Sequence, residues 1–252
     1  MRAFSALMGL VTTVAVLLGA PWGPERQHEV TLEEVLVLGA DESLPTEYLL
    51  GVPWQVAAMA DGPIYIADRS IFGIKAFSRD GTYLRTIGSR GVGPGEFRDL
   101  TAMSLLGDGL LVADGSNKRV SMFSAEGLVI WDEPMDVRDM VYPRRVRASP
   151  EGELVFLYKL PGVVEGRGVV NADSNALFHF YDAPMGSKTR VLGRWDTVLG
   201  SGSLADVLSS FAPGSFDISA GGDIVYAPPV PTGDLFLFGG ANGRESSRRT
   251  TL

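Results

Sequence analysis

The chain has 252 residues, of which 45% are hydrophobic and 21% charged, and this composition is that of a globular core rather than of a disordered chain. Its formal charge of −8 makes it a poor candidate for binding nucleic acid, because such affinity comes largely from neutralising phosphates. It has no cysteine, which excludes disulfides, a lipid-modified cysteine anchor, thiolate metal sites and cysteine nucleophiles.

Residues 1–20 have the pattern of a secretory signal peptide. Arg2 supplies the positive charge, and residues 7–19 form an apolar run that is too short for the ~20 apolar residues of a spanning helix. We therefore expect an exported chain, periplasmic or extracellular, with no membrane span once the leader is removed. Cleavage after Ala20 fits imperfectly because Leu18 is large, so an uncleaved leader that tethers the chain to the membrane stays open as an alternative.

The next predicted element is a strand over residues 30–39, within an N-terminal segment of residues 21–51. Its apolar residues are Val30, Leu32 and the run at residues 35–38. A strand from one terminus of a chain commonly completes a sheet built by the other terminus and hides its edge. This segment is therefore a candidate for such a completing strand.

One pattern occurs twice between residues 64 and 127. Residues 64–68 return 46 residues later, so that Asp68 corresponds to Asp114, and Phe77 corresponds to Phe123 at the same spacing. A four-strand unit of roughly 40 to 50 residues cannot bury its own faces alone and stacks radially with copies of itself. The repetition therefore predicts an all-β fold, a β-propeller built of four-stranded antiparallel blades.

Each of the first two units is predicted to contain four strands. These strands cover residues 54–59, 64–67, 74–77 and 83–87 in the first unit, and residues 100–106, 110–113, 120–123 and 128–131 in the second. Tight turns between strands carry glycine after an acidic residue, at Gly62, Gly81, Gly109 and Gly127. Glycine accepts a positive φ at little steric cost, so these dipeptides are typical of strand reversals.

Two further units are less regular. The third is predicted over residues 141–148, 153–160, 177–181 and 190–195, with residues 161–176 inserted between its second and third strands. The fourth is predicted over residues 216–219, 224–227 and 235–238, and a polar run after them makes a weak outer strand. The blades are therefore expected to occupy residues 52–98, 99–138, 139–213 and 214–252.

Two segments resemble those of a known family. Residues 116–123 resemble the core of an NHL repeat, and residues 91–97 resemble the inter-blade segment that accompanies it. The chain is thereby similar to exported bacterial six-bladed β-propeller proteins of the NHL type, although Ile71 and Gly73 depart from the repeat. The resemblance implies a ring of six blades. Since four units are predicted, we expect an open arc of such a ring, C-terminally incomplete, with a four-blade ring as the alternative.

The alternation of strands separates two faces of such blades. The tight turns, in which glycine follows an acidic residue, lie on one face. The long loops and inter-blade connections lie on the other, which we call the long-loop face. Because long loops on a rigid scaffold are where binding usually concentrates, we expect a protein, peptide or glycan partner to bind there. The candidate partner contacts are Arg90, Glu96, Arg98, Asp99, Lys118, Arg119 and Arg167.

Some polar residues also have a structural interpretation. Asp68 and Asp114 end equivalent strands, and we expect them to accept hydrogen bonds from nearby backbone N–H groups rather than to hold a metal. Glu96 and Phe97 are expected to close the seam between two blades, since an aromatic side chain brings a large apolar area to a packed interface.

Other residues bear on catalysis. A strand that contains Arg144, Arg145 and Arg147 is interpreted as a solvated edge, with an anion site as the alternative. His179 falls within an apolar strand and is expected to be packed. No dinucleotide or Walker motif and no Gly-x-Ser-x-Gly elbow occurs, so no catalytic, cofactor-binding or metal-binding residue is predicted. The alternative function is a propeller enzyme, a metal-assisted hydrolase or lyase with its site at the central channel, by analogy of fold alone.

Overall fold

The computed structural model describes residues 33–39, 43–135, 143–158, 176–199, 214–229, 234–239 and 247–251. It contains two compact units, Met1–Val35 and Leu36–Leu252, and all the described strands lie in the second unit. The predicted leader and residues 161–175 of the predicted insertion lie outside the described residues, whereas Ala176 is described as part of a strand. None of the helices in the described residues is long and apolar enough to cross a membrane.

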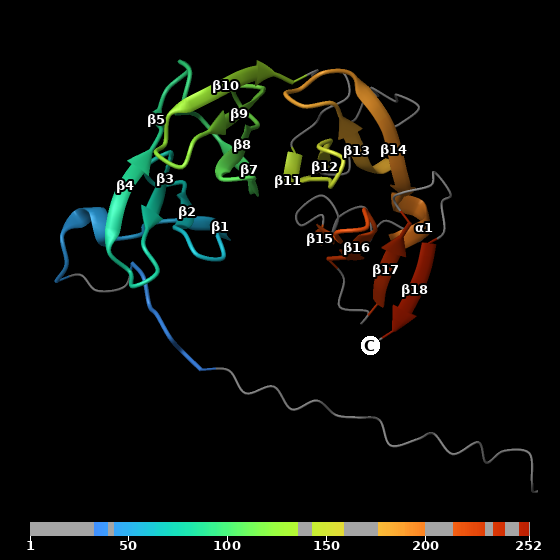
Figure 1. The fold of residues 1–252 in the computed structure, drawn as a ribbon, viewed down its shortest axis with the longest axis horizontal. Coiled ribbons are helices and arrows are strands. Elements are labelled where there is room, and N and C mark those ends of the chain that lie inside the picture. Colours follow the sequence, from blue (N-terminus) through green and yellow to red (C-terminus); the bar gives the residue numbers. More distant parts are fainter. Residues whose placement is uncertain are drawn as a thin grey trace, which may run out of the picture. The chain divides into compact units, whose positions relative to one another are not determined.

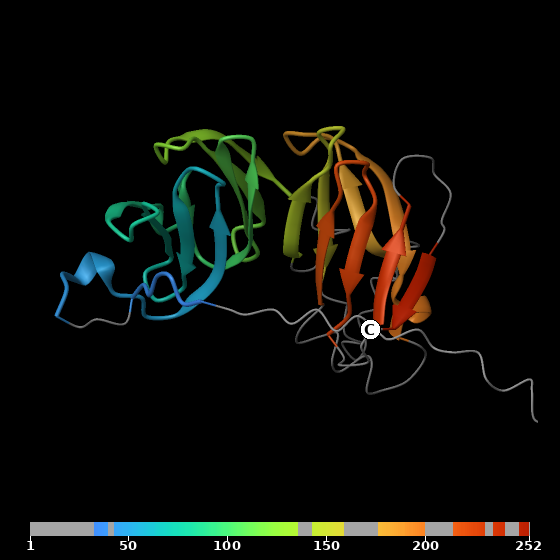
Figure 2. The same cartoon turned by 60° about the horizontal axis from the view of Figure 1, so that its bottom comes forward.

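The described residues of the second unit form four antiparallel sheets of four strands each, and the strands of each sheet follow one another in chain order (Figure 1). The first two sheets contain β1 (Pro53–Ala58), β2 (Ile64–Asp68), β3 (Gly73–Phe77) and β4 (Tyr83–Ile87), then β7 (Leu100–Leu106), β8 (Gly109–Asp114), β9 (Arg119–Phe123) and β10 (Val129–Pro134). The other two contain β11 (Pro143–Ala148), β12 (Leu154–Tyr158), β13 (Ala176–Tyr181) and β14 (Lys188–Arg194), then β15 (Ser215–Ile218), β16 (Ile224–Ala227), β17 (Asp234–Phe238) and β18 (Ser247–Thr251). The predicted all-β fold of four-stranded antiparallel blades is confirmed, and Figure 2 shows the strands of each blade side by side.

Short elements connect the blades. The strands β5 (Ser89–Arg90) and β6 (Glu96–Phe97) pair in parallel between the first and second blades. A 3-10 helix, η1 (Thr46–Tyr48), precedes β1. The helix α1 (Trp195–Leu199) begins at a residue that was predicted to end a strand, and the buried ring of Trp195 packs edge-on against Tyr226 of the fourth blade. Packing against the next blade therefore decides the conformation of this tryptophan.

The hydrophobic core lies between successive blades. One cluster joins the first and second blades, a second joins the second and third, and a third joins the third and fourth. Representative residues of the three clusters are Tyr65, Ile74 and Phe123, then Val120, Val146 and Phe156, then Leu157, Phe178 and Tyr226. A blade therefore buries its faces against its neighbours, as the repeat argument requires.

The first strands of the blades share a local irregularity. Consecutive first strands contact one another, from β1 to β7, from β7 to β11 and from β11 to β15. Three of them begin with a β-bulge, in which the extra residue is Trp54 in β1, Thr101 in β7 and Arg144 in β11. A bulge leaves its extra residue outside the ladder and redirects its side chain. The repeat therefore places these three side chains at equivalent positions, where each first strand begins.

Two sequence predictions of local structure are corrected. The described part of the expected strand, residues 33–39, forms no strand, because Leu36 and Leu38 lie against Gly81 in the β3–β4 turn and pack there by side chains rather than by a ladder. The positive φ predicted for turn glycines is present at Gly81 and Gly127, at 87° and 86°, but it is absent at Gly62. In the β7–β8 turn it falls on Gly107, at 57°, and not on Gly109.

Candidate functional site

Two buried carboxylates hold the backbone at the long-loop face. Asp68, the last residue of β2, accepts hydrogen bonds from the backbone amides of Gly51 (2.8 Å) and Val52 (2.9 Å). It also accepts hydrogen bonds from the amide (2.9 Å) and the hydroxyl (2.6 Å) of Ser70. Burial raises the pKa of this carboxyl, but the hydrogen bonds from Ser70, Val52 and Gly51 outweigh burial, and the pKa is lowered overall. The charged carboxylate therefore ties the end of β2 to the chain that enters β1.

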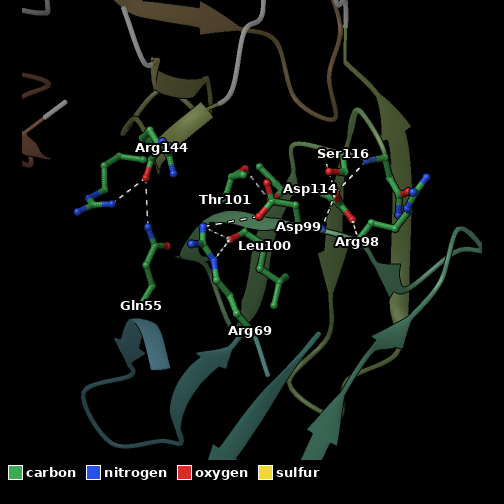
Figure 3. A network of polar contacts seen from close by, with 12 residues as sticks. Gln55, Arg69, Arg98, Asp99, Leu100, Thr101, Asp114, Ser116 and Arg144 are labelled. Atoms are coloured by element: carbon green, nitrogen blue, oxygen red, sulfur yellow. Dashed lines mark hydrogen bonds and ion pairs between the residues drawn. The ribbon is translucent and has the colours of Figure 1, made fainter. Parts of the chain in front are cut away.

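Asp114 occupies the equivalent position in the second blade (Figure 3). Its Oδ2 accepts a hydrogen bond from the amide of Arg98 (2.7 Å), and its Oδ1 accepts one from the amide of Asp99 (3.2 Å). The amides of Ser116 and Asn117 also donate to Oδ1, both at 2.9 Å. The expectation that these aspartates bind backbone N–H groups is confirmed. The chain entering β7 is held in the same way as the chain entering β1.

The inter-blade loop between β5 and β6 is closed by its own side chains. The Oε2 of Glu96 accepts a hydrogen bond from the amide of Gly93 (2.8 Å). Phe97 is fully buried, with its ring centroid 5.7 Å from that of Phe123. A Cβ at Gly88 would overlap the Phe97 ring, so glycine is required there. The seam interpretation is confirmed for Phe97, and the carboxylate of Glu96 is engaged within the loop.

Arg119 faces the same loop from the second blade. Its Nη1 lies 2.9 Å from the Oδ2 of Asp132 in β10, and its Nη2 donates to the carbonyl oxygens of Glu96 (2.9 Å) and Gly93. The side-chain amide of Asn117 donates to the carbonyl oxygen of Gly91 (2.9 Å). The guanidinium of Arg119, a predicted partner contact, is therefore engaged in holding the loop between the blades.

Two other predicted contacts, Arg90 and Arg98, are exposed. The guanidinium of Arg90 lies over the ring of Phe72, 4.9 Å from its centroid. The amide of Arg98 is held by the second buried carboxylate, while its side chain extends outward. The half-buried Asp99 lies 3.6 Å from the Nη2 of Arg69. Arg98 is thus presented from backbone that the Asp114 carboxylate holds, and Arg90 from the strand β5 that pairs with β6.

Lys118 has a positive φ of 56°, which is uncommon for a residue with a side chain. Phe72, its counterpart 46 residues earlier, has a φ of 52°. The shared conformation is therefore a property of the repeated β2–β3 and β8–β9 turns. The carbonyl oxygen of Lys118 also accepts a hydrogen bond from the amide of Met135 (2.8 Å). The remaining predicted contact, Arg167, lies outside the described residues.

A further polar group, which no motif had indicated, lies where β1, β7 and β11 meet (Figure 3). Gln55 donates a hydrogen bond to the carbonyl oxygen of Arg144 (3.1 Å) and accepts one from the amide of Met103 (2.6 Å). The Gln55 side chain thereby connects the first strands of the first, second and third blades. The guanidinium of Arg69 lies over the ring of Trp54, 3.8 Å from its centroid. It also donates hydrogen bonds to the carbonyl oxygen of Leu100, the first residue of β7.

The strand β11 is the edge strand of its sheet, as interpreted, but it is not fully solvated. It packs against β7 of the preceding blade, so Arg144, Arg145 and Arg147 are half-buried. The solvated part of the interpretation is wrong because alternation within one strand does not reveal which neighbour covers it. The signal that could have indicated this site is the equivalence of Trp54, Thr101 and Arg144 at the starts of first strands.

The described residues contain no group of three or more His, Asp or Glu side chains placed to hold a metal ion. His179 is buried in β13, and its ring packs edge-on against Tyr158 with centroids 4.8 Å apart. The packed interpretation of this histidine is confirmed.

Comparisons with known proteins agree with the fold. Residues 45–156 match the model of the DUF5128 family, described as a 6-bladed beta-propeller. No curated protein matches the sequence. A Bacteroides fragilis protein that is described as exported is 12% identical with a TM-score of 0.59, over 81% of this chain and 52% of that one. A chain of a nidogen/laminin complex is 13% identical with a TM-score of 0.51, over 81% and 65%.

At these identities the two solved structures show the fold alone. The chain spans about half of the length of the first and under two thirds of the second. The family match covers the first two blades and the start of the third, and the described sheets continue the same four-stranded pattern beyond it. The chain is therefore a β-propeller protein, and its residues 45–156 are similar to the six-bladed propellers that the family model describes.

Proposed function

We propose that this chain is an exported binding module that presents its long-loop face to a negatively charged protein, peptide or glycan partner. Export is supported by the leader pattern at residues 1–20. The B. fragilis protein of similar fold is also described as exported. The fold supports a binding role because loops on a rigid scaffold are common recognition surfaces.

The observation that carries the proposal is the fixed presentation of cations at this face. Arg90 and Arg98 are exposed, and their segments are held by the loop seam and by the buried carboxylate of Asp114. The carboxylates nearby are engaged within the fold, since Glu96 closes its loop and Asp99 lies beside a guanidinium. Arg90 and Arg98 are therefore exposed cations whose neighbouring carboxylates already have partners within the fold, although the whole chain carries −8. Ordering costs on binding are small when the contacting groups are already held in place.

The test uses the purified full chain on arrays of acidic and neutral peptides and glycans. We expect binding to acidic members that weakens with added salt, because the contact is electrostatic and exposed. The double variant Arg90→Glu with Arg98→Glu should lose at least about tenfold in affinity, since reversed charges repel an acidic ligand.

A matched control is Arg79→Glu, which reverses an exposed charge in the β3–β4 turn on the opposite face. This variant should bind like the unaltered chain. Binding that is lost in the control and retained in the double variant would contradict the proposal. Recovery of the protein in the cytoplasmic fraction, with residues 1–20 intact, would contradict the export part.

A further inference from the structure

Three arginines lie in β11, and a fourth, Arg69, lies over the ring of Trp54 that Arg144 also approaches. This inner arginine cluster consists of Arg69, Arg144, Arg145 and Arg147. Burial lowers the pKa of Arg145, and the charges of Arg147 and Arg144 lower it further. Burial also lowers the pKa of Arg69, against the attraction of Asp99 and with added repulsion from Arg144. The cluster thus brings like charges together in a partly desolvated place.

The carboxylates near the cluster are too few to balance it. Within the described residues, Asp99 and Asp217 each lie beside one guanidinium, at 3.6 Å and 3.3 Å. Arg144 and Arg145 form no ion pair with any described carboxylate. Among the described residues, two positive charges therefore have no carboxylate beside them, although the whole chain has 30 acidic residues and 22 lysines and arginines.

Arg144 has unused hydrogen-bonding capacity. Its Nε is buried and has no hydrogen-bond partner, which is costly for a polar group. Its guanidinium carbon lies 5.9 Å from the ring centroid of Trp54. This cation–π contact stabilises the positive charge but gives none of the N–H groups a hydrogen-bond acceptor. Gln55 bonds to the backbone carbonyl of Arg144 and leaves the guanidinium untouched (Figure 3). The one described hydrogen bond of the Arg145 side chain also goes to that carbonyl oxygen, at 2.8 Å.

The position of Arg144 is set by the fold. It is the extra residue of the β11 bulge, equivalent to Trp54 and Thr101 in the preceding blades. Thr101 is buried and donates to the carbonyl oxygen of Ala113, so its polar group is satisfied within its own blade. Of these three equivalent positions, the one in the third blade thus holds a charged donor that its own blade does not satisfy.

We propose that the inner arginine cluster binds a small, multiply charged oxyanion, a polycarboxylate or a phosphate, through Arg144 and Arg145. The proposal rests on the function proposed above and deepens it by naming the ligand chemistry at the start of the first strands. A planar guanidinium matches carboxylate and phosphate oxygens with two parallel hydrogen bonds. Two adjacent uncompensated guanidinium groups favour a ligand with more than one negative charge.

The test is calorimetric titration of the full chain with citrate, inorganic phosphate and acetate at equal ionic strength. Citrate or phosphate should bind at least about tenfold more tightly than acetate, because one carboxylate offsets one charge only. The tighter of the two assigns the ligand as polycarboxylate or phosphate. Arg144→Gln and Arg145→Gln should each weaken that binding by about tenfold or more.

A thermal unfolding series provides a second readout. Without added anion, Arg144→Gln should unfold at the same or a higher temperature than the unaltered chain, since a repelling and unpaired group is removed. Added citrate should raise the unfolding temperature of the unaltered chain more than that of the variant. Arg144→Lys, which keeps the charge and loses the planar fork, should have intermediate affinity.

The matched control is Arg190→Gln, which removes the same charge from β14, where Arg190 pairs with Glu153 at 3.0 Å. Its affinity for citrate and phosphate should equal that of the unaltered chain. Equal binding by the Arg144 and Arg145 variants and the unaltered chain, or binding of neither anion, would overturn the inference. If small anions fail to bind while the acidic arrays still respond to the Arg90 and Arg98 reversals, this inference fails and the proposed function stands.

Discussion

The first two blades are copies in sequence, yet they bury very different fractions of their first strands. Val56 in β1 pairs with Ile66, and Met103 in β7 pairs with the corresponding Val112. Val56 is 65% exposed, whereas Met103 is 4% exposed. The second blade contributes to the clusters on both of its sides, while the first contributes to one. Burial in this fold is therefore a property of the neighbouring blade and not of the repeat itself.

Other features are the same in both copies. The buried carboxylates of Asp68 and Asp114 accept equivalent backbone hydrogen bonds. The bulge at the start of the first strand and the left-handed residue after the second strand also recur. The aspartate, the bulge and the left-handed residue depend on contacts within one repeat and the segment that leads into its first strand. The repeat therefore specifies the backbone of the long-loop face, and the neighbours specify the packing.

The largest expected effect is at the seam that the two copies share. Phe97→Ala removes a fully buried ring that packs against Phe123, so it should cost about 3–5 kcal/mol of the free energy of unfolding. Unfolding in urea, followed by tryptophan fluorescence, measures this loss. A loss under about 1 kcal/mol would mean that the seam is not a principal contact between the blades.

The next effect concerns the buried aspartate that ends the second strand in both copies. Asp114→Ala leaves four backbone amides without their acceptor and should cost about 3 kcal/mol, since each buried donor left unpaired carries a desolvation penalty. Asp114→Asn keeps one carbonyl oxygen and should lose less. Urea midpoints of the two variants provide the measurement. An alanine variant as stable as the asparagine variant would show that the hydrogen bonds contribute little.

The contrast in burial predicts unequal responses at equivalent positions. Met103→Ala should destabilise by about 2–3 kcal/mol because it opens a cavity between blades. Val56→Ala should change stability by under about 0.5 kcal/mol because its side chain is largely exposed. Thermal unfolding of the two variants side by side measures the difference. Equal losses would show that β1 is covered in solution.

The smallest effect is a dependence on pH at Asp68. Its pKa is lowered in the folded chain, so its stabilising contribution is complete above the unfolded pKa of about 3.9 and is lost as pH falls through the folded value. Stability should therefore fall with acidification below about pH 4, and Asp68→Asn should flatten this part of the profile. Urea midpoints between pH 6 and pH 3 test the slope. A profile that is unchanged in the variant would assign the acid sensitivity to other carboxylates.

The sequence predicted the parts of the fold that depend on the repeat. Residues 83–87 and 100–106 are strands with the predicted bounds, because alternation and turn residues lie within one unit. The helix at Trp195 was missed because its tryptophan packs against a residue of the next blade. The strand expected at residues 30–39 was wrong over its described part, since alternation does not reveal whether a partner ladder exists.

The candidate site was predictable in part. The sequence indicated the long-loop face and its exposed residues Arg90 and Arg98, since loop length and charge are local features. It did not indicate that Arg119 would hold a loop 23 residues away, or that Gln55 would meet Arg144 across 89 residues. Such contacts arise from stacking of blades, and no spacing within one repeat encodes them.

The central claim is that buried aspartates hold the long-loop face in one conformation. Amide hydrogen exchange tests it most directly, at Gly51 and Val52 in the first copy and at Arg98 and Asp99 in the second. We predict slow exchange at all four amides, and fast exchange at the exposed Val92, for which no described backbone hydrogen bond exists. Exchange at the four amides as fast as at Val92 would contradict the account.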